Sequence, residues 1–448
     1  MPATISRRRF VQTAAPAVWT SGRAAPSERI RVGFIACGGR ALGLMRMLAR
    51  HPDVDIPAIS DAIEPRMAQA QQALSRGPYP QKPEGLLDYR RILERKDIDA
   101  VFIATTQHWH GIPFIHACQA GKPIYIEKPL SHTVAEARAM VQAAKRHGVM
   151  VLMGTQQRAG AHYKKAVEIV RSGRLGKIGL VESWNYADRG ERVGRAPDSD
   201  PPPGYHWDLW LGPAPYVPFN PARLLHNWWF DYSGGILTNW GPHHFDIILW
   251  AMQAEWPKSV VAAGGKFVLD DLADTYDTFD AAWEFPGFLM TYRSRSFNNF
   301  HSIQSRPRHH GICFYGQQAT LVVDRYGYEL YSNTTQKKYV LYEFPMEPPV
   351  ETMPGFPYST GRLPSGEMDG QDGPFQRTFI DCVKEGRKPP IDLDESYRST
   401  VWCHLGTIAY LARRRISWNG RNETITGDPD AARLLDRPRR KGFELPKV

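Results

Sequence analysis

Short apolar segments alternate with helical segments through the first third of the chain, and this alternation is the feature that most constrains the fold. The apolar segments predict strands over residues 30–35, 54–60, 100–104, 124–126 and 149–153. The segments between them place apolar residues at helical spacing, which predicts helices over 40–49, 65–74, 89–95, 110–120 and 132–147. Strands joined by helices in this way form a parallel, doubly wound sheet with right-handed crossovers. The first part of the chain is therefore predicted to be an α/β domain.

The pattern changes after residue 155, where strands follow one another with fewer helices between them. The expected strands cover 178–185, 259–267, 277–285, 288–297, 311–315 and 320–324. This pattern favours a largely antiparallel open sheet and an α+β domain. Helices are expected over 161–172, 375–385 and 395–413, and long irregular stretches over 189–204 and 346–373.

The turn after the first strand carries part of a dinucleotide-binding fingerprint. Residues 36–41 read Ala-Cys-Gly-Gly-Arg-Ala, which keeps only the middle glycine, Gly38, of the pattern G-x-G-x-x-G. That glycine is the one at which the backbone approaches a pyrophosphate. Asp61 ends the second strand, where a carboxylate accepts the ribose hydroxyls of NAD; a helix N-cap is the alternative. Arg40 and Arg66 are near enough in sequence to meet a 2′-phosphate, so NADP stays possible.

Two later motifs bring chemistry to this fold. Glu127-Lys128-Pro129 follows the predicted strand 124–126, and a lysine at the carboxyl end of a parallel strand lies where such sheets bind their ligands. The second motif, residues 241–246, reads Gly-Pro-His-His-Phe-Asp. Hydride transfer from a carbinol needs a base for the hydroxyl proton and a cation for the oxygen. His243 is suited to the first role and Lys128 to the second.

With Gly38-Gly39 and Asp61, these motifs resemble the glucose–fructose oxidoreductase/inositol dehydrogenase family, Gfo/Idh/MocA, over roughly residues 29–435. The resemblance implies a bound nicotinamide cofactor, a carbohydrate substrate and a homodimer or homotetramer formed through the open sheet. It implies that the cofactor is contacted by Gly38, Gly39, Arg40, Asp61, Thr105, Gln107, Trp109, His110, Glu127, Lys128 and Gln156. Trp109 and His110 have an alternative role in packing at a helix start.

The catalytic set predicted from the family pattern is Lys128, Asn239, His243 and Asp246. Asn239 departs from the pattern, because many dehydrogenases of the family have Asp there, and an amide does not raise the basicity of a nearby histidine. His243 and Asp246 are three residues apart on an expected helix start, so they can share one face. The cluster His243-His244-x-Asp246 also suggests metal binding, but no third ligand has a known spacing, and no metal is predicted.

Polar and aromatic residues of the second domain are candidates for a sugar pocket, since aromatic faces stack on pyranose C–H groups. The predicted substrate contacts, besides Lys128, Asn239 and His243, are Arg158, Tyr163, Asn185, His226, Trp229 and Tyr232.

The N-terminus predicts export. Residues 6–11, Ser-Arg-Arg-Arg-Phe-Val, match a twin-arginine signal, for which a disordered basic leader is the alternative. We therefore divide the chain into a signal segment (1–28), a dinucleotide-binding Rossmann domain (29–155) and a substrate-binding and oligomerisation domain (156–448). Late helices within 375–414 are expected to pack back on the Rossmann domain. The twin-arginine route carries folded proteins, so a tightly bound cofactor in the periplasm is expected.

Composition narrows the function classes. The chain of 448 residues has a formal charge of +10, but much of it lies in arginines near the two ends, and no nucleic-acid-binding module is recognisable. No apolar run is long enough for a membrane span. The five cysteines show no metal-ligand or redox spacing.

Three functions remain open from the sequence. The first is a sugar oxidoreductase with bound NAD or NADP. The second is a redox-neutral NAD-dependent glycosidase, which oxidises a ring hydroxyl transiently, eliminates the leaving group, adds water and restores the hydride. The third is a non-catalytic sugar sensor, against which the presence of both Lys128 and His243 argues.

Overall fold

The computed structural model describes residues 28–186, 189, 192–300, 302–303, 306–333, 349–354 and 372–448. The predicted signal segment lies outside these residues apart from Glu28, and so does most of the expected irregular stretch 346–373. None of the helices in the described part of the chain has the length and apolar character needed to cross a membrane.

The N-terminal domain contains the predicted parallel sheet. The predicted strands are β1 (Ile30–Ile35), β2 (Val54–Ser60), β4 (Ala100–Ile103), β5 (Ile124–Ile126) and β6 (Val151–Met153), and the sheet has one strand that was not predicted, β3 (Glu84–Leu86). They lie in the order β3-β2-β1-β4-β5-β6, and every neighbouring pair is parallel. The chain reverses its direction of winding between β1 and β4, which is the switch point where doubly wound sheets bind ligands.

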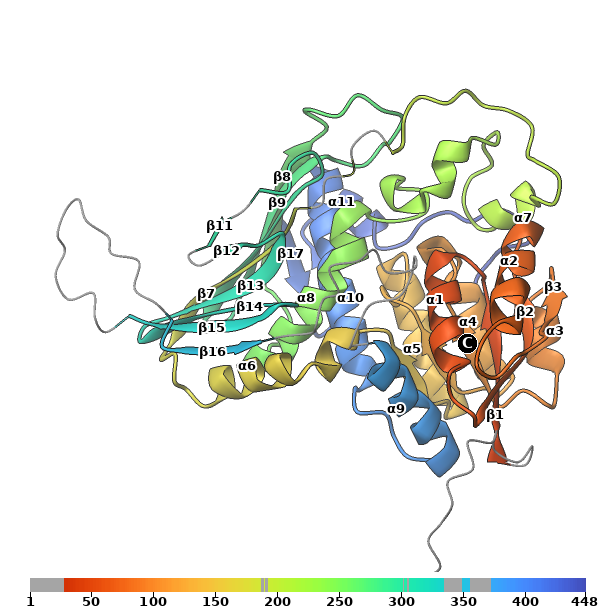
Figure 1. Cartoon of the computed structure of the whole chain (residues 1–448). Helices are drawn as coiled ribbons and strands as arrows, with labels where there is room; N and C mark the ends of the chain where they lie inside the picture. Colours follow the sequence, from red (N-terminus) through yellow and green to blue (C-terminus); the bar gives the residue numbers. More distant parts are fainter. Residues whose placement is uncertain are drawn as a thin grey trace, which may run out of the picture.

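Helices cover both faces of this sheet. They are α1 (Gly39–Leu48), α2 (Glu64–Ser75), α3 (Arg90–Glu94), α4 (Gly111–Gln119) and α5 (Val134–His147). A helix from the far end of the sequence, α9 (Asp372–Glu385), also packs here, beside α1 (Figure 1). The Phe379 ring lies edge-on to Phe102 of β4 at 5.4 Å, and Arg377 forms an ion pair with Asp53 at 2.7 Å.

The C-terminal domain is built on a ten-stranded sheet of order β16-β15-β14-β13-β7-β10-β9-β8-β17-β18. The described pairs are antiparallel except β7 with β10, which is parallel. The predicted strands correspond to β7 (Ile178–Tyr186), β8 (Ser259–Gly265), β9 (Thr278–Phe285), β10 (Phe288–Arg295), β13 (His310–Gly316) and β14 (Ala319–Asp324). The predicted fold class, a parallel α/β domain followed by a largely antiparallel α+β domain, is confirmed.

Four strands of this sheet were not predicted. They are β15 (Gly327–Ser332), β16 (Glu351–Pro354), β17 (Ile416–Asn419) and β18 (Thr424–Thr426). They occupy the two ends of the sheet. Three of them, β16, β17 and β18, have only three or four residues, which is too short for apolar alternation to mark a strand. A further pair, β11 (Ser302–Ile303) and β12 (Arg306–Pro307), forms a separate two-stranded ribbon.

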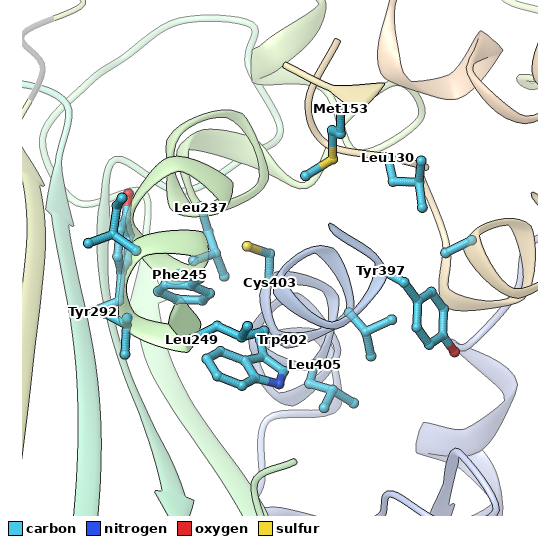
Figure 2. Close-up of a cluster of buried hydrophobic side chains, with 14 of the residues drawn as sticks. Leu130, Met153, Leu237, Phe245, Leu249, Tyr292, Tyr397, Trp402, Cys403 and Leu405 are labelled. Atoms are coloured by element: carbon cyan, nitrogen blue, oxygen red, sulfur yellow. The ribbon is translucent and has the colours of Figure 1, made fainter. Parts of the chain in front are cut away.

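Two long helices, α8 (Gly235–Met252) and α10 (Leu393–Ala412), lie between the large sheet and the Rossmann domain (Figure 1). Figure 2 shows their apolar contact: Leu237, Phe245 and Leu249 of α8 face Trp402, Cys403 and Leu405 of α10. Leu130 and Met153 bring the Rossmann domain into the same core, which is buried from solvent. The two domains therefore share one hydrophobic core, and this fixes α8 relative to the strand ends of the first sheet.

The helix expected to start near His243 begins earlier, at Gly235, so His243 and Asp246 lie inside α8. The sequence prediction was wrong here because Pro242, a residue typical of a first helical turn, lies within the helix. A proline inside a helix lacks the N–H that would bond the carbonyl four residues back. Burial of α8 against α10 stabilises the helix despite this loss.

Candidate functional site

A cavity of about 930 Å³ lies at the carboxyl ends of β1, β2, β4 and β5 and extends to α8 and the large sheet. Of the predicted site residues, fourteen line it: Gly38, Gly39, Arg40, Asp61, Thr105, Gln107, Trp109, Glu127, Lys128, Gln156, Asn185, His226, Asn239 and His243. Residues that are far apart in the sequence are thus brought to one site. The cavity has a Rossmann part, around Gly38 and Asp61, and a part at the second domain, around Lys128 and His243.

The Rossmann part fits a dinucleotide. A Cβ atom added at Gly38 would meet no atom within 4 Å, so the backbone borders open space there. Gly38 caps α1 without a side-chain hydrogen bond, which leaves the N–H groups of the first helical turn available to a pyrophosphate. Asp61 is held by the backbone N–H groups of Cys37 at 2.7 Å and Ile63 at 2.8 Å, one to each carboxylate oxygen. Each oxygen has a second lone pair for a ribose hydroxyl.

The Asp61 carboxylate and the contacts of Arg40 favour NAD over NADP, although Arg66 also lines the cavity. The pKa of Asp61 is raised by burial, and the nearby charge of Arg66 opposes that rise. Arg40, which the sequence suggested as a partner for a 2′-phosphate, instead donates through Nε to Glu127 Oε1 at 2.7 Å. Gln156 donates to the same oxygen at 3.2 Å. A 2′-phosphate would therefore meet the Asp61 carboxylate with Arg40 already engaged elsewhere.

The loop after β4 forms one wall of the cavity. Gln107 and Trp109 line it, whereas His110 does not. His110 contacts the Pro129 carbonyl through Nδ1 at 2.7 Å and the Thr105 carbonyl through Nε2 at 3.2 Å. The structure therefore places His110 as a link between the loop after β4 and the loop after β5, which bears Lys128.

Lys128 extends from the end of β5 to α8. Its Nζ donates to the Asn239 backbone carbonyl at 2.5 Å and to Asn239 Oδ1 at 3.0 Å. Burial lowers the pKa of Lys128 to about 8; the charge of Glu127 opposes this, whereas Arg40 and Arg325 add to it. Asn239 thus holds the ammonium by two oxygens, and an ammonium with this pKa is still charged at neutral pH.

His243 lies one helical turn beyond Asn239 and is only 4% exposed. Its Nδ1 has no hydrogen-bond partner among the described residues. Burial holds the pKa of His243 well below its usual value, and the positive charges of Lys128 and Arg325 lower it further. The imidazole is therefore neutral at physiological pH, with a nitrogen free to bond a ligand hydroxyl.

The neighbouring His244 has a packing role. Its Nε2 accepts from Trp240 Nε1 at 3.0 Å, and its Nδ1 contacts Ser183 Oγ at 2.8 Å. Both ring nitrogens are therefore occupied. In the described part of the chain, no group of three or more His, Cys, Asp or Glu side chains is arranged to hold a metal ion.

The structure does not bring Arg158 and Asp246 to the cavity. Arg158 donates to Asp246 through Nε at 2.7 Å and Nη2 at 2.8 Å, and to Glu395 at 2.7 Å. Asp246 is fully buried in this pair. Three further predicted substrate contacts are also absent from the lining: Tyr163, Trp229 and Tyr232. Trp229 and Tyr232 belong to a tryptophan-rich cluster, where Arg223 stacks on the Trp229 ring at 4.3 Å.

Several lining residues were missed by the sequence reasoning, among them His309, His310 and Arg325. They lie in the second half of the chain, in no motif that marks a site. One weak signal was present, since His310 opens β13 and Arg325 directly follows β14. Polar residues at the ends of buried strands frequently face a ligand crevice, but only the sheet order shows that these two ends meet the same cavity.

Residues 192–232 of the second domain, here named the roof, close the cavity over the Rossmann domain. They include α7 (Trp207–Leu211) and two short 3-10 helices, η4 (Pro221–Leu224) and η5 (His226–Trp228). Tyr205 forms a β-bridge with Ile63, two residues after Asp61, and the His206 imidazole contacts Glu64 at 2.7 Å. On the other wall, Trp109 Nε1 donates to the Trp210 carbonyl at 2.9 Å.

The last residues of the chain fasten the roof. Arg440 donates to Asp208 Oδ1 at 2.5 Å, to the Asp208 carbonyl at 2.8 Å and to the Gly212 carbonyl at 2.7 Å. Phe443 packs edge-on against Trp109 at 5.6 Å. Arg437 donates to the His108 carbonyl at 2.8 Å and to the Asp231 carbonyl at 3.2 Å. The roof is thus tied to the Rossmann domain at both walls of the cavity.

The Rossmann domain and the cavity are those of a dinucleotide-binding protein, and family models agree. Residues 30–155 match the model "Oxidoreductase family, NAD-binding Rossmann fold". Residues 164–265 match "Oxidoreductase family, C-terminal alpha/beta domain", and 216–322 match "GFO/IDH/MocA C-terminal domain". The chain belongs to the Gfo/Idh/MocA oxidoreductase family. The N-terminal match also confirms NAD as the cofactor predicted for the Rossmann domain.

Characterised and uncharacterised relatives share only part of their length with this chain. The oxidoreductase YrbE of Bacillus subtilis, itself uncharacterised, is 32% identical over 156 residues, which is 35% of this chain and 44% of YrbE. An alpha-N-acetylgalactosaminidase of Shewanella oneidensis is 30% identical over 154 residues, 34% of each chain. The chain therefore spans less than half the length of these curated relatives.

Solved structures match over most of the chain and show the fold. The aldose-aldose oxidoreductase of Caulobacter crescentus, in complex with glycerol, superposes with a TM-score of 0.59 at 17% identity, covering 87% of this chain and 99% of that chain. A levoglucosan dehydrogenase in complex with NADH and L-sorbose gives a TM-score of 0.62 at 17% identity, with the same coverage.

Proposed function

We propose that this protein oxidises a hydroxyl group of a sugar or sugar derivative and that it holds NAD tightly while doing so. The observation that carries the proposal is the arrangement of one cavity. Its Rossmann part offers Gly38 and Asp61 to a dinucleotide, and its other part presents Lys128, Asn239 and His243. Sugar-oxidising proteins of the same fold support the choice of substrate class.

When bound, NAD supplies the acceptor for the hydride of the carbinol carbon. Gly38 and the first turn of α1 would hold its pyrophosphate, and Asp61 its ribose. With NAD and substrate bound, the apolar lining residues Leu209, Leu224 and Leu225 of the roof, with Tyr89, would limit the access of water to the reacting groups. Exclusion of water strengthens each charge interaction within the site.

The protein residues handle the proton and the developing negative charge. Lys128 is fixed on Asn239, so its ammonium is preorganised to donate to the substrate oxygen. Such a fixed donor is worth more than one that must reorganise. His243 is neutral and has an unpartnered Nδ1, so it can accept the hydroxyl proton.

Tight retention of the cofactor is supported by the roof. The cofactor site lies beneath contacts that join the roof to Ile63, Glu64 and Trp109. Release of a dinucleotide requires several of these contacts to break together. A cofactor that stays bound must be restored within the protein, either by a second carbonyl substrate or by a redox-neutral cycle.

A specific observation favours the redox-neutral glycosidase as a second candidate. A relative that is 30% identical over 34% of this chain is an alpha-N-acetylgalactosaminidase. Asn239, which replaces the acid of many family dehydrogenases, is compatible with this chemistry because no net oxidation is needed. In this cycle the hydride returns to the same sugar after elimination and addition of water.

The two candidates are separated by adding single sugars and aryl glycosides to the purified protein without added cofactor. We expect a sugar to produce an absorbance band of reduced nicotinamide, stoichiometric with protein, that persists until a second carbonyl compound is added. Glycoside cleavage without a lasting band would support the glycosidase. The control is Lys128→Met, which should keep its bound cofactor and show neither response. Absence of any dinucleotide in the denatured wild-type protein would contradict the proposal.

We also propose export through the twin-arginine route, because Ser6-Arg7-Arg8-Arg9-Phe10-Val11 matches its signal. Expression in a bacterium that has this route, followed by fractionation, tests the proposal. We expect the wild-type chain in the periplasm, and the double variant Arg7→Lys, Arg8→Lys in the cytoplasm. Equal distribution of the two proteins would contradict it.

A further inference from the structure

Beyond Lys128 and His243, the cavity is bounded by residues of the large sheet and of α8. We name Asn185, Trp240, His310 and Arg325 the sheet wall; all four line the cavity. Asn185 of β7 and His310 of β13 are cross-strand partners. Arg325 follows β14, and Trp240 comes from α8, one residue after the Lys128 partner Asn239.

The sheet wall has polar atoms that lack partners. Asn185 is 4% exposed and its Oδ1 has no hydrogen bond among the described residues; His310 is 9% exposed and its Nδ1 has none. His243 Nδ1 also lacks a hydrogen-bond partner among the described residues. The Trp240 ring contacts both the His243 ring and the His310 ring. Buried polar atoms are nearly always hydrogen-bonded in folded proteins. These three indicate a ligand with several polar groups.

The sheet wall is also cationic. Arg325 is 5% exposed, and its guanidinium lies over the Trp240 ring at 4.5 Å. The same ring lies 5.1 Å from His310 and 5.6 Å from His243. Trp240 therefore contacts both the arginine and the residue proposed to take the substrate proton. A single small molecule can reach from one to the other.

The acidic residues among the described lining residues are Asp61, in the Rossmann part of the cavity, and Glu127, whose charge also acts on the adjacent Lys128. Asp61 accepts the backbone N–H groups of Cys37 and Ile63, and Glu127 accepts from Arg40. The positive charge of Arg325 acts on three residues around the substrate part of the cavity. It contributes to the lowered pKa values of Lys128, His243 and His310. An anion bound there would relieve this repulsion.

We propose that the substrate is a sugar acid, whose carboxylate binds Arg325 at the sheet wall while its reacting hydroxyl lies between Lys128 and His243. The planar guanidinium fork of Arg325, which lines the cavity and stacks on Trp240, matches a carboxylate in shape and charge. This inference rests on the proposed function, since it assigns the substrate class of the same cavity.

The test compares binding of uronic acids with that of their neutral parents by the NAD-loaded wild-type protein. Glucuronate is paired with glucose, galacturonate with galactose, and glucose 6-sulfate is the further anion. Calorimetry or tryptophan fluorescence gives each Kd without turnover. We expect at least one uronate to bind about tenfold or more tightly than its parent, with a difference that shrinks as salt is added.

Arg325→Met should weaken uronate binding by about thirtyfold and leave the neutral parent within about twofold, because only the charge pair is removed. Arg325→Lys keeps the charge without the fork and should fall between the two. The matched control is Arg295→Met. Arg295 also stacks on an aromatic ring, that of Tyr186 at 3.8 Å, but does not line the cavity. It should leave the uronate preference unchanged.

Equal affinity of wild-type protein for uronates and parents would overturn the inference, as would an unchanged preference in Arg325→Met. Preference for the sulfate over every uronate would overturn the carboxylate assignment. If Arg325→Met does not fold, the wild-type comparison and Arg325→Lys still decide the matter. Reduction of bound NAD by neutral sugars alone would refute the sugar-acid substrate and leave the proposed function standing, whereas absence of bound NAD would refute the proposed function.

Discussion

His243 and Asp246 lie three residues apart on α8, yet their surroundings are opposite. His243 reaches the cavity and has an unpartnered nitrogen, whereas Asp246 is buried with two hydrogen bonds from Arg158. His243 is left unsatisfied where a ligand can enter, whereas Asp246, three residues further along α8, is satisfied within the protein. The contrast teaches that a short motif can combine a residue available for chemistry with one that holds the helix in place.

The largest effect on activity is expected at His243, the residue with the unpartnered nitrogen. His243→Ala should lower kcat/KM by about a thousandfold, the usual range for loss of a general base, equivalent to about 4 kcal/mol. Stability should change little, because the replaced imidazole has a buried nitrogen without a partner. Steady-state kinetics and chemical denaturation measure the two effects. A large loss of stability with normal activity in His243→Ala would contradict the roles assigned to His243 and Asp246.

Asp246→Ala should give the opposite result. It leaves the buried Arg158 guanidinium with Glu395 as its remaining carboxylate partner. Removal of one partner from a buried ion pair costs about 3 kcal/mol in free energy of unfolding. The expected outcome is a lower denaturation midpoint with kcat reduced much less than in His243→Ala. Asp246→Asn, which keeps the shape, is the control and should lose less stability.

The pH dependence of kcat/KM sharpens the roles of Lys128 and His243. The ammonium of Lys128 is the required form, and it is lost as pH rises through its pKa of about 8. Activity should therefore fall tenfold per pH unit above that value. The neutral form of His243 is the required one, and its depressed pKa keeps it neutral, so no loss is expected near pH 6.5. A rate that increases through pH 8 would make Lys128 the base.

The smallest effect is expected at the roof. Arg440→Ala removes three hydrogen bonds to Asp208 and Gly212. Dissociation of NAD should become about five to ten times faster, because exposed charge-assisted contacts contribute about 1 kcal/mol. Release is followed by displacement with a fluorescent dinucleotide analogue. Arg433→Ala, which removes an exposed pair with Asp430 on α11 (Pro429–Arg433), is the control. Equal release rates in wild-type protein and Arg440→Ala would show that Arg440 does not help to retain the cofactor.

Local patterns predicted the Rossmann domain well because its signals are close in sequence. The strand before Gly38, the helix after it and Asp61 at the next strand end all lie within one crossover. The ten-stranded sheet was predicted only by class. Its order places β7 beside β10 in a parallel pair, and such a non-local pairing leaves no trace in either strand alone.

The site divides in the same way. Lys128, Asn239 and His243 were found because they occupy recognisable motifs, and the structure brings them together. Arg325 and His310 were missed since each is close to the cavity only through the sheet order. Arg158 and Tyr163 were assigned to the substrate on residue type alone. The structure instead places Arg158 against Asp246, and buries Tyr163 within the core.

Gly212 ends α7 with a φ of +50°, and a Cβ atom built there would lie 2.2 Å from the Trp109 ring. No side chain fits between the roof and that ring, so the backbone at Gly212 packs directly against Trp109. An alanine here would force Trp109 or the roof to move, because no Cβ atom packs so close to a ring, at the point where Arg440 donates to the Gly212 carbonyl. The close contact between the roof and Trp109 thus depends on the absence of a side chain at Gly212.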